Sequence, residues 1–502
     1  MARFLVSHRL SGQPADNGRL RSRALFEDTI PEFQDFSTTL AAGASTVDHG
    51  RHVRLVEGDA RDFHSKKAEL HSNIIIEPEC CRLPALFRPL RALQSAPIFA
   101  GIGAAVEAEI TSNQAPLANV QVSLFVTGSQ GSSAVSGITD ADGHVLLPYD
   151  PRQWSAFALI CTPSSGAWSW MVRQITPTMR LDLPPLPKTG PLGWHHAMLG
   201  ISAFSETAGA NVRVAVADTG VGPHPYLAHV ESAGAFVNLE SQTGPGALGD
   251  TAQHGTHVCG IIGARPAAGT GDFGGIAPGA NLIAARVYLG GGPPTEPSGT
   301  ASSGDISLAI DALSTTHRAD IINLSLGSAE QSEIEADAIA SAIEHGALVV
   351  CAAGNSNGGP VMFPAAYAQS VGISALGLLG VAPDGSLDAS TFPSDPRRFT
   401  AGGLYVPQFV NLGPEIRCTC PGAAIISTVP GAVPLYAVMS GTSMATPAVC
   451  GALATVLSQD AAYLALPRGV ERASRAWQAL ASTLRDLGLA SQFQGFGLPA
   501  GF

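Results

Sequence analysis

Charged side chains are scarce in this chain of 502 residues, where they make up only 14%, and aromatic residues make up only 6%. Acidic residues outnumber basic ones, which gives a formal net charge of -12. Nucleic-acid-binding proteins carry a basic surface, so we predict that nucleic acid is not a partner. Hydrophobic residues nevertheless reach 45%, which is typical of a globular protein with a large core and excludes a disordered chain.

Long apolar runs are also missing. No stretch of about 18 consecutive apolar residues occurs, so we predict no membrane span. The first residues, Met1 to Arg9, contain no apolar segment of the length that a secretory signal needs. This absence predicts a protein that is cytoplasmic as synthesised, with export by a non-classical route as the alternative.

The cysteines lack the spacing of a disulfide framework or a zinc site. Of the eight, Cys80 and Cys81 are adjacent and Cys418 and Cys420 are two residues apart. Three more lie in segments predicted to be core helices or strands near the motifs discussed below: Cys259, Cys351 and Cys450. We therefore expect free buried thiols, as in a reducing compartment.

A lone serine opens an uncharged helix. Gly441-Thr442-Ser443-Met444-Ala445-Thr446-Pro447 runs into the apolar stretch 448–457. Proline is tolerated in the first turn, which places the helix start at or just before Ser443. The serine then lies at the positive end of the helix dipole, beside unpaired backbone N–H groups that could serve an oxyanion. Simple N-capping is the alternative explanation.

Three further polar residues occur at ends of predicted strands or helices. Asp218 follows the buried strand 212–217, His254 opens a small-residue helix, and Asn355 follows the strand 348–351. The carboxyl ends of parallel strands form the edge at which α/β sheets bind ligands. The chain order Asp218, His254, Ser443 is the subtilisin order of a Ser-His-Asp triad.

Four motifs together resemble those of the subtilisin-like serine proteases, the subtilases. They are Val216-Ala217-Asp218-Thr219-Gly220, His254-Gly255-Thr256-His257-Val258, Ala353-Gly354-Asn355 and the segment 441–447. The segment 322–327 is similar to the substrate-binding strand of the family. The resemblance covers about residues 187 to 502 and implies an α/β fold with a mostly parallel sheet flanked by helices.

The resemblance also implies roles for single residues. Ser443 would be the nucleophile, His254 its base and Asp218 the residue that orients the base, while Asn355 would donate to the oxyanion. The residues expected to bind substrate are Ser303, Gly304, Ser325, Leu326, Gly327, Ala353, Gly354 and Met362. Met362 would shorten the pocket for the residue before the scissile bond, so we expect a preference for small or medium apolar residues there.

No cofactor or metal is predicted. Many subtilases bind calcium in a loop after the histidine helix, but here the loop Arg265–Gly271 contains no carboxylate or amide side chain. Nine residues after Asp218 stands Leu227, not an acid. The best-known calcium site of the family is therefore not matched, although calcium elsewhere stays an alternative.

The chain divides into three predicted domains. Residues 1–95 show mixed helix and strand signals that resemble an inhibitor-type propeptide, with an unrelated small α+β domain as the alternative. Residues 96–186 alternate like the strands of a β-sandwich and resemble a carboxypeptidase-regulatory or transthyretin-like module, with a hairpin turn at 140–143. Residues 187–502 are the predicted catalytic domain, in which helices and strands alternate. Its expected strands are 212–217, 282–288, 320–324, 347–352 and 370–375, and its expected helices are 254–264, 305–317, 332–345 and 443–458.

The leading interpretation is a serine endopeptidase that cuts protein or peptide substrates through an acyl-enzyme and is made as an autoprocessed or self-inhibited precursor. A partner could also inhibit it. A peptide transpeptidase or macrocyclase on the same fold is the first alternative, for which the loop 290–304 is the only candidate cap. An inactive peptide-binding relative is the second, and the complete set of four site residues argues against it.

Overall fold

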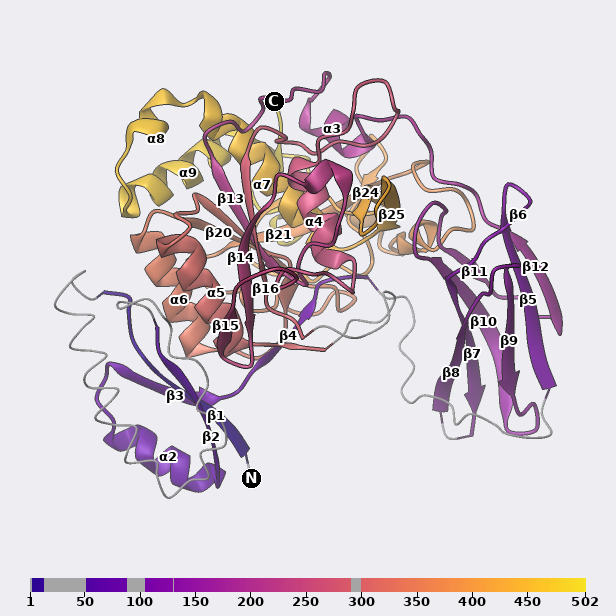
Figure 1. The fold of residues 1–502 in the computed structure, drawn as a ribbon, viewed down its shortest axis with the longest axis horizontal. Helices are drawn as coiled ribbons and strands as arrows, with labels where there is room; N and C mark the ends of the chain where they lie inside the picture. Colours follow the sequence, from indigo (N-terminus) through magenta and orange to yellow (C-terminus); the bar gives the residue numbers. More distant parts are fainter. Residues whose placement is uncertain (1, 13–50, 88–103, 130, 290–298) are drawn as a thin grey trace.

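The computed structural model describes residues 2–12, 51–87, 104–129, 131–289 and 299–502. Three parts are visible in Figure 1: a small N-terminal unit and a β-rich module lie on opposite sides of a large α/β unit. The α/β unit comprises the described residues from 187 on. The predicted domain boundaries at 95 and 186 stay predictions.

A nine-stranded sheet forms the centre of the α/β unit. Its order is β15-β14-β16-β13-β18-β20-β21-β22, with β23 also paired to β21. The pairs from β14 through β16, β13, β18, β20 and β21 to β23 are all parallel. The strands are β13 (Arg213–Asp218), β14 (Glu231–Val237), β15 (Glu240–Gln242), β16 (Asn281–Arg286), β18 (Ile321–Leu324), β20 (Leu348–Ala352), β21 (Val371–Leu378), β22 (Leu404–Tyr405) and β23 (Ile416–Pro421).

Helices cover both faces of this sheet because the central strands are apolar on both sides. In β13, Val214 and Val216 pack with helices α4 and α7, whereas Ala215 and Ala217 pack with α5 and α6. The helices are α3 (Trp194–Leu199), α4 (His254–Gly263), α5 (Ser303–Thr315), α6 (Glu333–Glu344), α7 (Thr442–Gln459), α8 (Ala461–Ala465), α9 (Val470–Thr483) and α10 (Ser491–Gln494). The α/β fold is confirmed, as are the expected strands and helices, within a few residues at their ends.

The N-terminal unit is a three-stranded antiparallel sheet, in the order β2-β1-β3, with one helix. Its elements are β1 (Ala2–His8), β2 (Val53–Gly58), α2 (Ala60–Glu69) and β3 (Ile74–Pro78). Phe4 and Val56 face Phe63 of α2, whereas Leu5 and Leu55, which alternate with them, join the core cluster of α5 and α6. The sheet is therefore covered by its own helix on one face and by the α/β unit on the other.

The β-rich module, residues 104–182, consists of two four-stranded sheets around one apolar core. One sheet has the order β11-β10-β7-β8, and the other has β12-β5-β6 with β9 paired to β5. Its strands are β5 (Ala104–Ser112), β6 (Ala115–Pro116), β7 (Val120–Gly128), β8 (Gly131–Ile138), β9 (His144–Tyr149), β10 (Trp154–Pro163), β11 (Trp170–Val172) and β12 (Thr178–Asp182).

The predicted hairpin at 140–143 is wrong, because β8 and β9 on either side of this turn belong to different sheets. The Asp140 side chain accepts hydrogen bonds from the backbone of Asp142 and His144, 3.0 and 2.9 Å away. This local turn sends the chain across the core from one sheet to the other. The Asp140 side chain thus has a structural role in the turn.

Short connecting strands complete the α/β unit and hold a segment of the N-terminal region. They are β17 (Ala301–Ser302), β19 (Leu326–Gly327), β24 (Ile425–Val429), β25 (Leu435–Met439), β26 (Leu484–Arg485) and β27 (Leu498–Pro499). The segment that they hold is β4 (Cys81–Pro84), which leaves the N-terminal unit and lies between β17 and β19. Among the described residues, no helix is both long and apolar enough to cross a membrane.

Candidate active site

Asp218 ends strand β13 and is buried, with 1% of its surface exposed. Its carboxylate oxygen Oδ1 accepts a hydrogen bond from the backbone N–H of Thr219 at 2.7 Å. The same oxygen lies 2.7 Å from Nδ1 of His254. The expected contact between the orienting carboxylate and the histidine is therefore present in the structure. It makes Nδ1 the proton-bearing nitrogen and leaves Nε2 free to act as a base.

His254 is the first residue of α4, and a network around Asp250 fixes the turn before it. The Asp250 carboxylate accepts from the backbone of Ala252, Gln253 and Thr256 at 2.9 to 3.0 Å, and from the Thr256 hydroxyl at 2.6 Å. This turn holds Gln253 at a φ of 68°, directly before the histidine. Sequence analysis missed Asp250. The sequence pattern that could have identified it is an aspartate four residues before a histidine that opens a helix.

The close approach of α4 to β13 requires a glycine at Gly255. A Cβ there would lie 2.2 Å from the carbonyl oxygen of Gly220. The Thr219 hydroxyl also accepts the N–H of Gly255 at 2.8 Å. Backbone contact between the strand end and the helix start therefore positions Asp218 against His254.

Ser443 is the second residue of α7 and is fully buried. Its hydroxyl donates to the backbone carbonyl of Ser325 at 2.9 Å. Within the described residues, Nε2 of His254 is buried without a hydrogen-bond partner. The third contact of the expected triad, from Ser443 to His254, is thus not formed in this arrangement. Such contacts are often loose before a reaction and tighten in the reacting complex.

Asn355 is held with its amide N–H groups toward Ser443. Its oxygen Oδ1 accepts from the backbone and hydroxyl of Thr442 at 3.0 and 3.1 Å, which assigns the other end of the side chain as the nitrogen. That nitrogen donates to the carbonyl oxygen of Ala85. The backbone N–H of Ser443 donates to the same oxygen at 3.3 Å. One carbonyl thus receives both donors that were expected to bind an oxyanion.

A segment of the chain itself occupies the groove at this site. Strand β4 is antiparallel to β19, with Pro84 opposite Leu326 and Leu83 opposite Gly327. On its other edge it is antiparallel to β17, with Arg82 opposite Ala301. The backbone N–H of Ala85 then donates to the carbonyl of Ser325 at 3.1 Å. The segment is thus added to the two edges as a further strand, and extended peptides bind to sheet edges in the same way.

Of the expected substrate-binding residues, Ser325, Leu326 and Gly327 lie along this groove. Ser303 also contacts the segment, because its N–H donates to the carbonyl of Cys80 at 2.8 Å. The role of Gly304 in substrate binding stays a prediction. Gly304 is inside helix α5, and a Cβ there would meet the side chains of Leu239 and Leu5 instead of the groove. The helix begins at Ser303, two residues earlier than expected, which places Gly304 in its first turn.

Met362 lies close to two of the residues expected to bind substrate, Gly327 and Gly354. A Cβ at Gly327 would be 3.2 Å from Cβ of Met362, and a Cβ at Gly354 would be 2.7 Å from its sulfur. The N–H of Met362 donates to the carbonyl of Ala353 at 3.0 Å. The methionine side chain thus lies beside both glycines, and its role in shortening the pocket stays a prediction.

Metal ligands were not predicted, and the residues near the expected calcium loop do not form a set of them. No group of three or more His, Cys, Asp or Glu side chains in the described ranges is placed to hold a metal ion. The carboxylate of Asp272, the residue directly after the loop 265–271, accepts a hydrogen bond from the Tyr226 hydroxyl at 2.8 Å. The independence of the site from metal stays a prediction.

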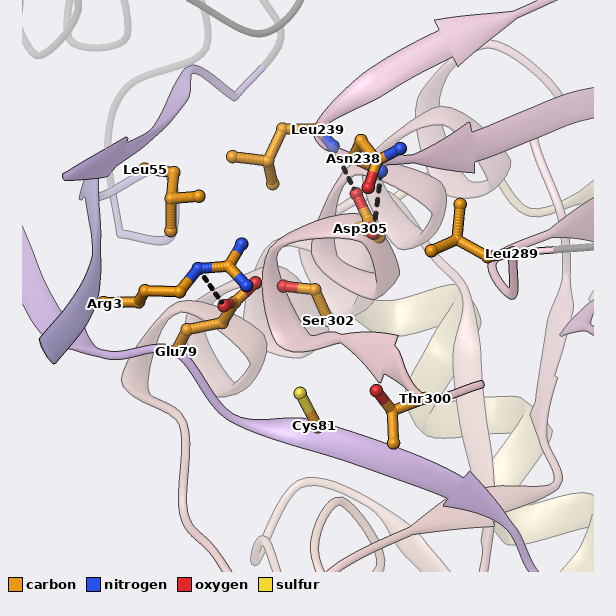
Figure 2. Close-up of a pocket in the computed structure, with 10 residues that line it drawn as sticks. All are labelled: Arg3, Leu55, Glu79, Cys81, Asn238, Leu239, Leu289, Thr300, Ser302 and Asp305. Atoms are coloured by element: carbon orange, nitrogen blue, oxygen red, sulfur yellow. Dashed lines mark hydrogen bonds and ion pairs between the residues drawn. The ribbon is translucent and has the colours of Figure 1, made fainter. Parts of the chain in front are cut away.

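A separate cavity of about 130 Å³ lies where the N-terminal unit meets the α/β unit (Figure 2). Arg3, Glu79 and Cys81 line one side, and Ser302 and Asp305 line the other. The Asp305 carboxylate accepts the N–H groups of two residues of the neighbouring turn, at 2.6 and 3.2 Å. Because its walls come from both units, this cavity belongs to their interface and not to the groove of Ser443.

The eight cysteines are all free, as predicted, and seven of them are buried. Burial raises the pKa of the Cys80 thiol to about 11 and that of Cys161 to about 12. Thiolates are the reactive form, so these thiols are unreactive wherever the protein is located. Burial therefore explains the free cysteines, and a reducing compartment is not needed to explain them.

Comparison with known families decides the classification. A family model described as "Subtilase family" matches residues 209–497, more than half of the chain. The chain belongs to the subtilase family. The matched range includes Asp218, His254, Asn355 and Ser443, and family membership supports serine endopeptidase activity.

Several proteases are similar to this subtilase over its second half. The minor extracellular protease Epr of Bacillus subtilis (strain 168) is 32% identical over 292 residues, which are 58% of this chain and 37% of Epr. Subtilisin Savinase of Lederbergia lenta is 33% identical over 259 residues, 51% of this chain and 79% of Savinase. A solved structure titled "S41 Psychrophilic Protease" aligns with 62% of this chain and 98% of its own, at 28% identity and a TM-score of 0.49.

The predicted cytoplasmic location of this subtilase is wrong. The relatives point to secretion, since Epr is named an extracellular protease. The major intracellular serine protease of Bacillus subtilis, 33% identical over 260 residues, is a weaker match. The prediction rested on the composition of residues 1–9 alone, which does not decide where a protein is located.

Proposed function

We propose that this subtilase is a serine endopeptidase in which Ser443, His254 and Asp218 form the catalytic triad. Ser443 Oγ attacks the carbonyl carbon of the scissile bond while His254 Nε2 takes its proton. The oxyanion that forms is held by Asn355 Nδ2 and the backbone N–H of Ser443. His254 then gives the proton to the leaving amine, and water releases the acyl group from Ser443. Asp218 keeps the histidine in the required tautomer throughout.

The observation that carries this proposal is the position of the Ala85 carbonyl. Its oxygen accepts both oxyanion donors, and its N–H pairs with Ser325. In a protease groove these contacts belong to the residue whose carbonyl is attacked. The bond between Ala85 and Leu86 is therefore the proposed site at which the precursor cuts itself.

The N-terminal unit is the proposed inhibitor of this precursor. Cleavage after Ala85 leaves β4 paired on both edges, so the product strand continues to block the groove until it dissociates. The unit is also attached outside the groove: the Glu77 carboxylate accepts from the Ser332 hydroxyl at 2.5 Å and from the N–H of Glu333, at the start of α6. The β-rich module lies after the cut and would stay with the mature enzyme.

Intact-mass analysis tests the proposal. Purified wild type should convert to fragments 1–85 and 86–502, with a new N-terminus at Leu86, and should cut an unfolded protein. Ser443→Ala should stay at full length. Ser458→Ala is the matched control, because this serine lies near the end of the same helix with its hydroxyl on the carbonyl of Thr455, and it should process normally.

The fragment masses also separate hydrolysis from peptide transfer. Hydrolysis adds one water to the summed masses of the two fragments, whereas a transpeptidase joins the acyl part to another amine without that water. A wild-type protein that stays intact and cuts nothing would contradict the proposal.

A further inference from the structure

Two side chains in the groove segment are buried, and they are three residues apart. Among residues 81 to 87, Arg82 is 0% exposed and Ala85 is 6% exposed, whereas the others are at least partly accessible. With Ala85 before the scissile bond, Arg82 is the fourth residue before it. The groove therefore encloses the first and fourth side chains fully and the two between them only in part.

Arg82 points away from the interface cavity and toward helix α6. Successive side chains of a strand point to opposite faces, and Cys81 faces the cavity in Figure 2. On the other face, Nε and one terminal nitrogen of Arg82 donate to the two carboxylate oxygens of Glu335, at 3.2 and 2.8 Å. Its other terminal nitrogen donates to the Ser328 hydroxyl at 2.6 Å. All of the acceptors belong to the α/β unit.

The acceptor site stays in place when the arginine leaves. The Ser332 hydroxyl accepts the N–H of Glu335 at 3.1 Å, which fixes the first turn of α6. The Tyr367 hydroxyl donates to the Glu335 carboxylate at 3.3 Å and to the Ser332 carbonyl at 2.7 Å. These contacts lie within the α/β unit, so the carboxylate keeps its direction toward the groove.

A guanidinium matches this acceptor set better than other side chains do. Its planar fork can serve both carboxylate oxygens at once, and it has a third edge for the serine hydroxyl. A lysine would offer a single point charge to the same oxygens. An apolar side chain would cover the carboxylate without pairing it, which is costly because the charge loses its water.

We propose that Glu335, with Ser328, makes this protease select substrates with arginine at the fourth residue before the scissile bond. This inference rests on the proposed function, and it extends from the enzyme's own segment to polypeptides that are cut in trans. The substrate class is an extended segment with arginine at the fourth position and a small residue at the first. Met362 limits the size of the side chain at the first position, and the Glu335 carboxylate pairs with the arginine at the fourth.

The experiment compares peptides of the sequence 82–87 that differ only at the fourth position, with the mature wild-type enzyme. Arginine, lysine, leucine and citrulline are the four residues, and citrulline keeps the shape of arginine without its charge. We expect kcat/KM for arginine to exceed that for leucine by about 30-fold or more, from the usual effect of removing one partner of an enclosed charge pair. Citrulline should fall near leucine.

A matched pair of variants isolates the carboxylate. Glu335→Gln should reduce the preference for arginine over leucine to about threefold or less, and a far-UV circular dichroism spectrum that matches the wild type shows that the variant is folded. Glu333→Gln is the control, because Glu333 lies in the same helical turn but pairs with Arg9, outside the groove. It should keep the full preference for arginine.

The outcomes distinguish this inference from the proposed function. Equal cleavage of the arginine and leucine peptides by the wild type would overturn the inference alone, and so would an unchanged preference in Glu335→Gln. If the wild type cut none of the peptides and no unfolded protein, the proposed function would fall, and the inference with it.

Discussion

Replacement of Arg51 should weaken the hold of the N-terminal unit on the mature enzyme. This side chain is 0% exposed and pairs with Asp311 of α5 and Asp337 of α6, both at 2.8 Å. Burial raises the pKa of both carboxyls, but at Asp337 the charge of Arg51 and the donors of Leu10 and Ser11 outweigh it, and the net shift is downward. At Asp311 burial prevails and its pKa is raised. We therefore assign the stronger charge pairing to Asp337.

The structure sets the size of this effect. Removing one partner of a buried ion pair costs about 3–5 kcal/mol, because the remaining charge stays enclosed and unpaired. Asp337 retains the N–H of Leu10 at 2.9 Å and the Ser11 hydroxyl at 2.5 Å, so we expect the lower end of the range. A loss of about 3 kcal/mol, at about 1.4 kcal/mol per factor of ten, means that Arg51→Met should raise the inhibition constant of the N-terminal unit by about 100-fold.

The assay uses the full chain after it has processed itself. Serial dilution of the processed complex, followed by the return of peptidase activity, gives the inhibition constant of the cleaved unit. Arg61→Met is the control, because the Arg61 side chain is 95% exposed and lies on the outer helix. Intact masses must first establish that each variant cuts at the same bond. An inhibition constant for Arg51→Met within threefold of wild type would refute the reasoning.

Three further predictions concern the α/β unit. Asn355→Ala should lower kcat by about 10²–10³ with little change in KM, measured on a small peptide, because one oxyanion donor is lost; an unchanged kcat would remove Asn355 from the mechanism. Met362→Ala should deepen the pocket beneath Ala85 and shift a peptide-library profile from small toward large residues at the first position, and a profile dominated by large aromatics in the wild type would contradict the assigned pocket floor. Burial, with a contribution from His254, lowers the pKa of His257 to about 3. The unfolded chain therefore takes up this proton first, so the stabilisation is complete above about pH 6.5 and falls by about 1.4 kcal/mol per pH unit toward pH 3. The measurement is the free energy of unfolding, obtained from urea titrations at several pH values in the inactive Ser443→Ala background. Replacement of His257 by glutamine should reduce the slope of this free energy against pH by up to one proton, and equal slopes would contradict this pKa.

The sequence could predict the placement of Asp218, His254, Ser443 and Asn355 because each stands at the end of a strand or the start of a helix. In a parallel sheet such ends meet at one edge, so local patterns are enough to predict that they lie close together. Helix α5 shows the limit of this reasoning, since it begins at Ser303, two residues earlier than expected, and so includes Gly304.

The groove segment could not be predicted in the same way. Cys81–Pro84 is too short for a periodic signal, and its pairing partners are more than 200 residues away in the sequence. The role of Glu335 could not be predicted either, because Ser332 and Glu335 have the spacing of a helix capping box, which already gives the glutamate a structural explanation. The serine does cap the helix, but the glutamate side chain faces Arg82 instead, which depends on tertiary contacts alone.

The pairing of β4 on both edges has a consequence for which proteins this enzyme can digest. A segment that enters between β17 and β19 must offer hydrogen-bonding groups on both sides, so it cannot belong to a helix or lie inside a sheet at that moment. The four or more residues before the cut have to come loose from their own protein first. For a folded target, the rate of digestion is then governed by the free energy of that local opening, and side-chain preference decides only among the segments that open.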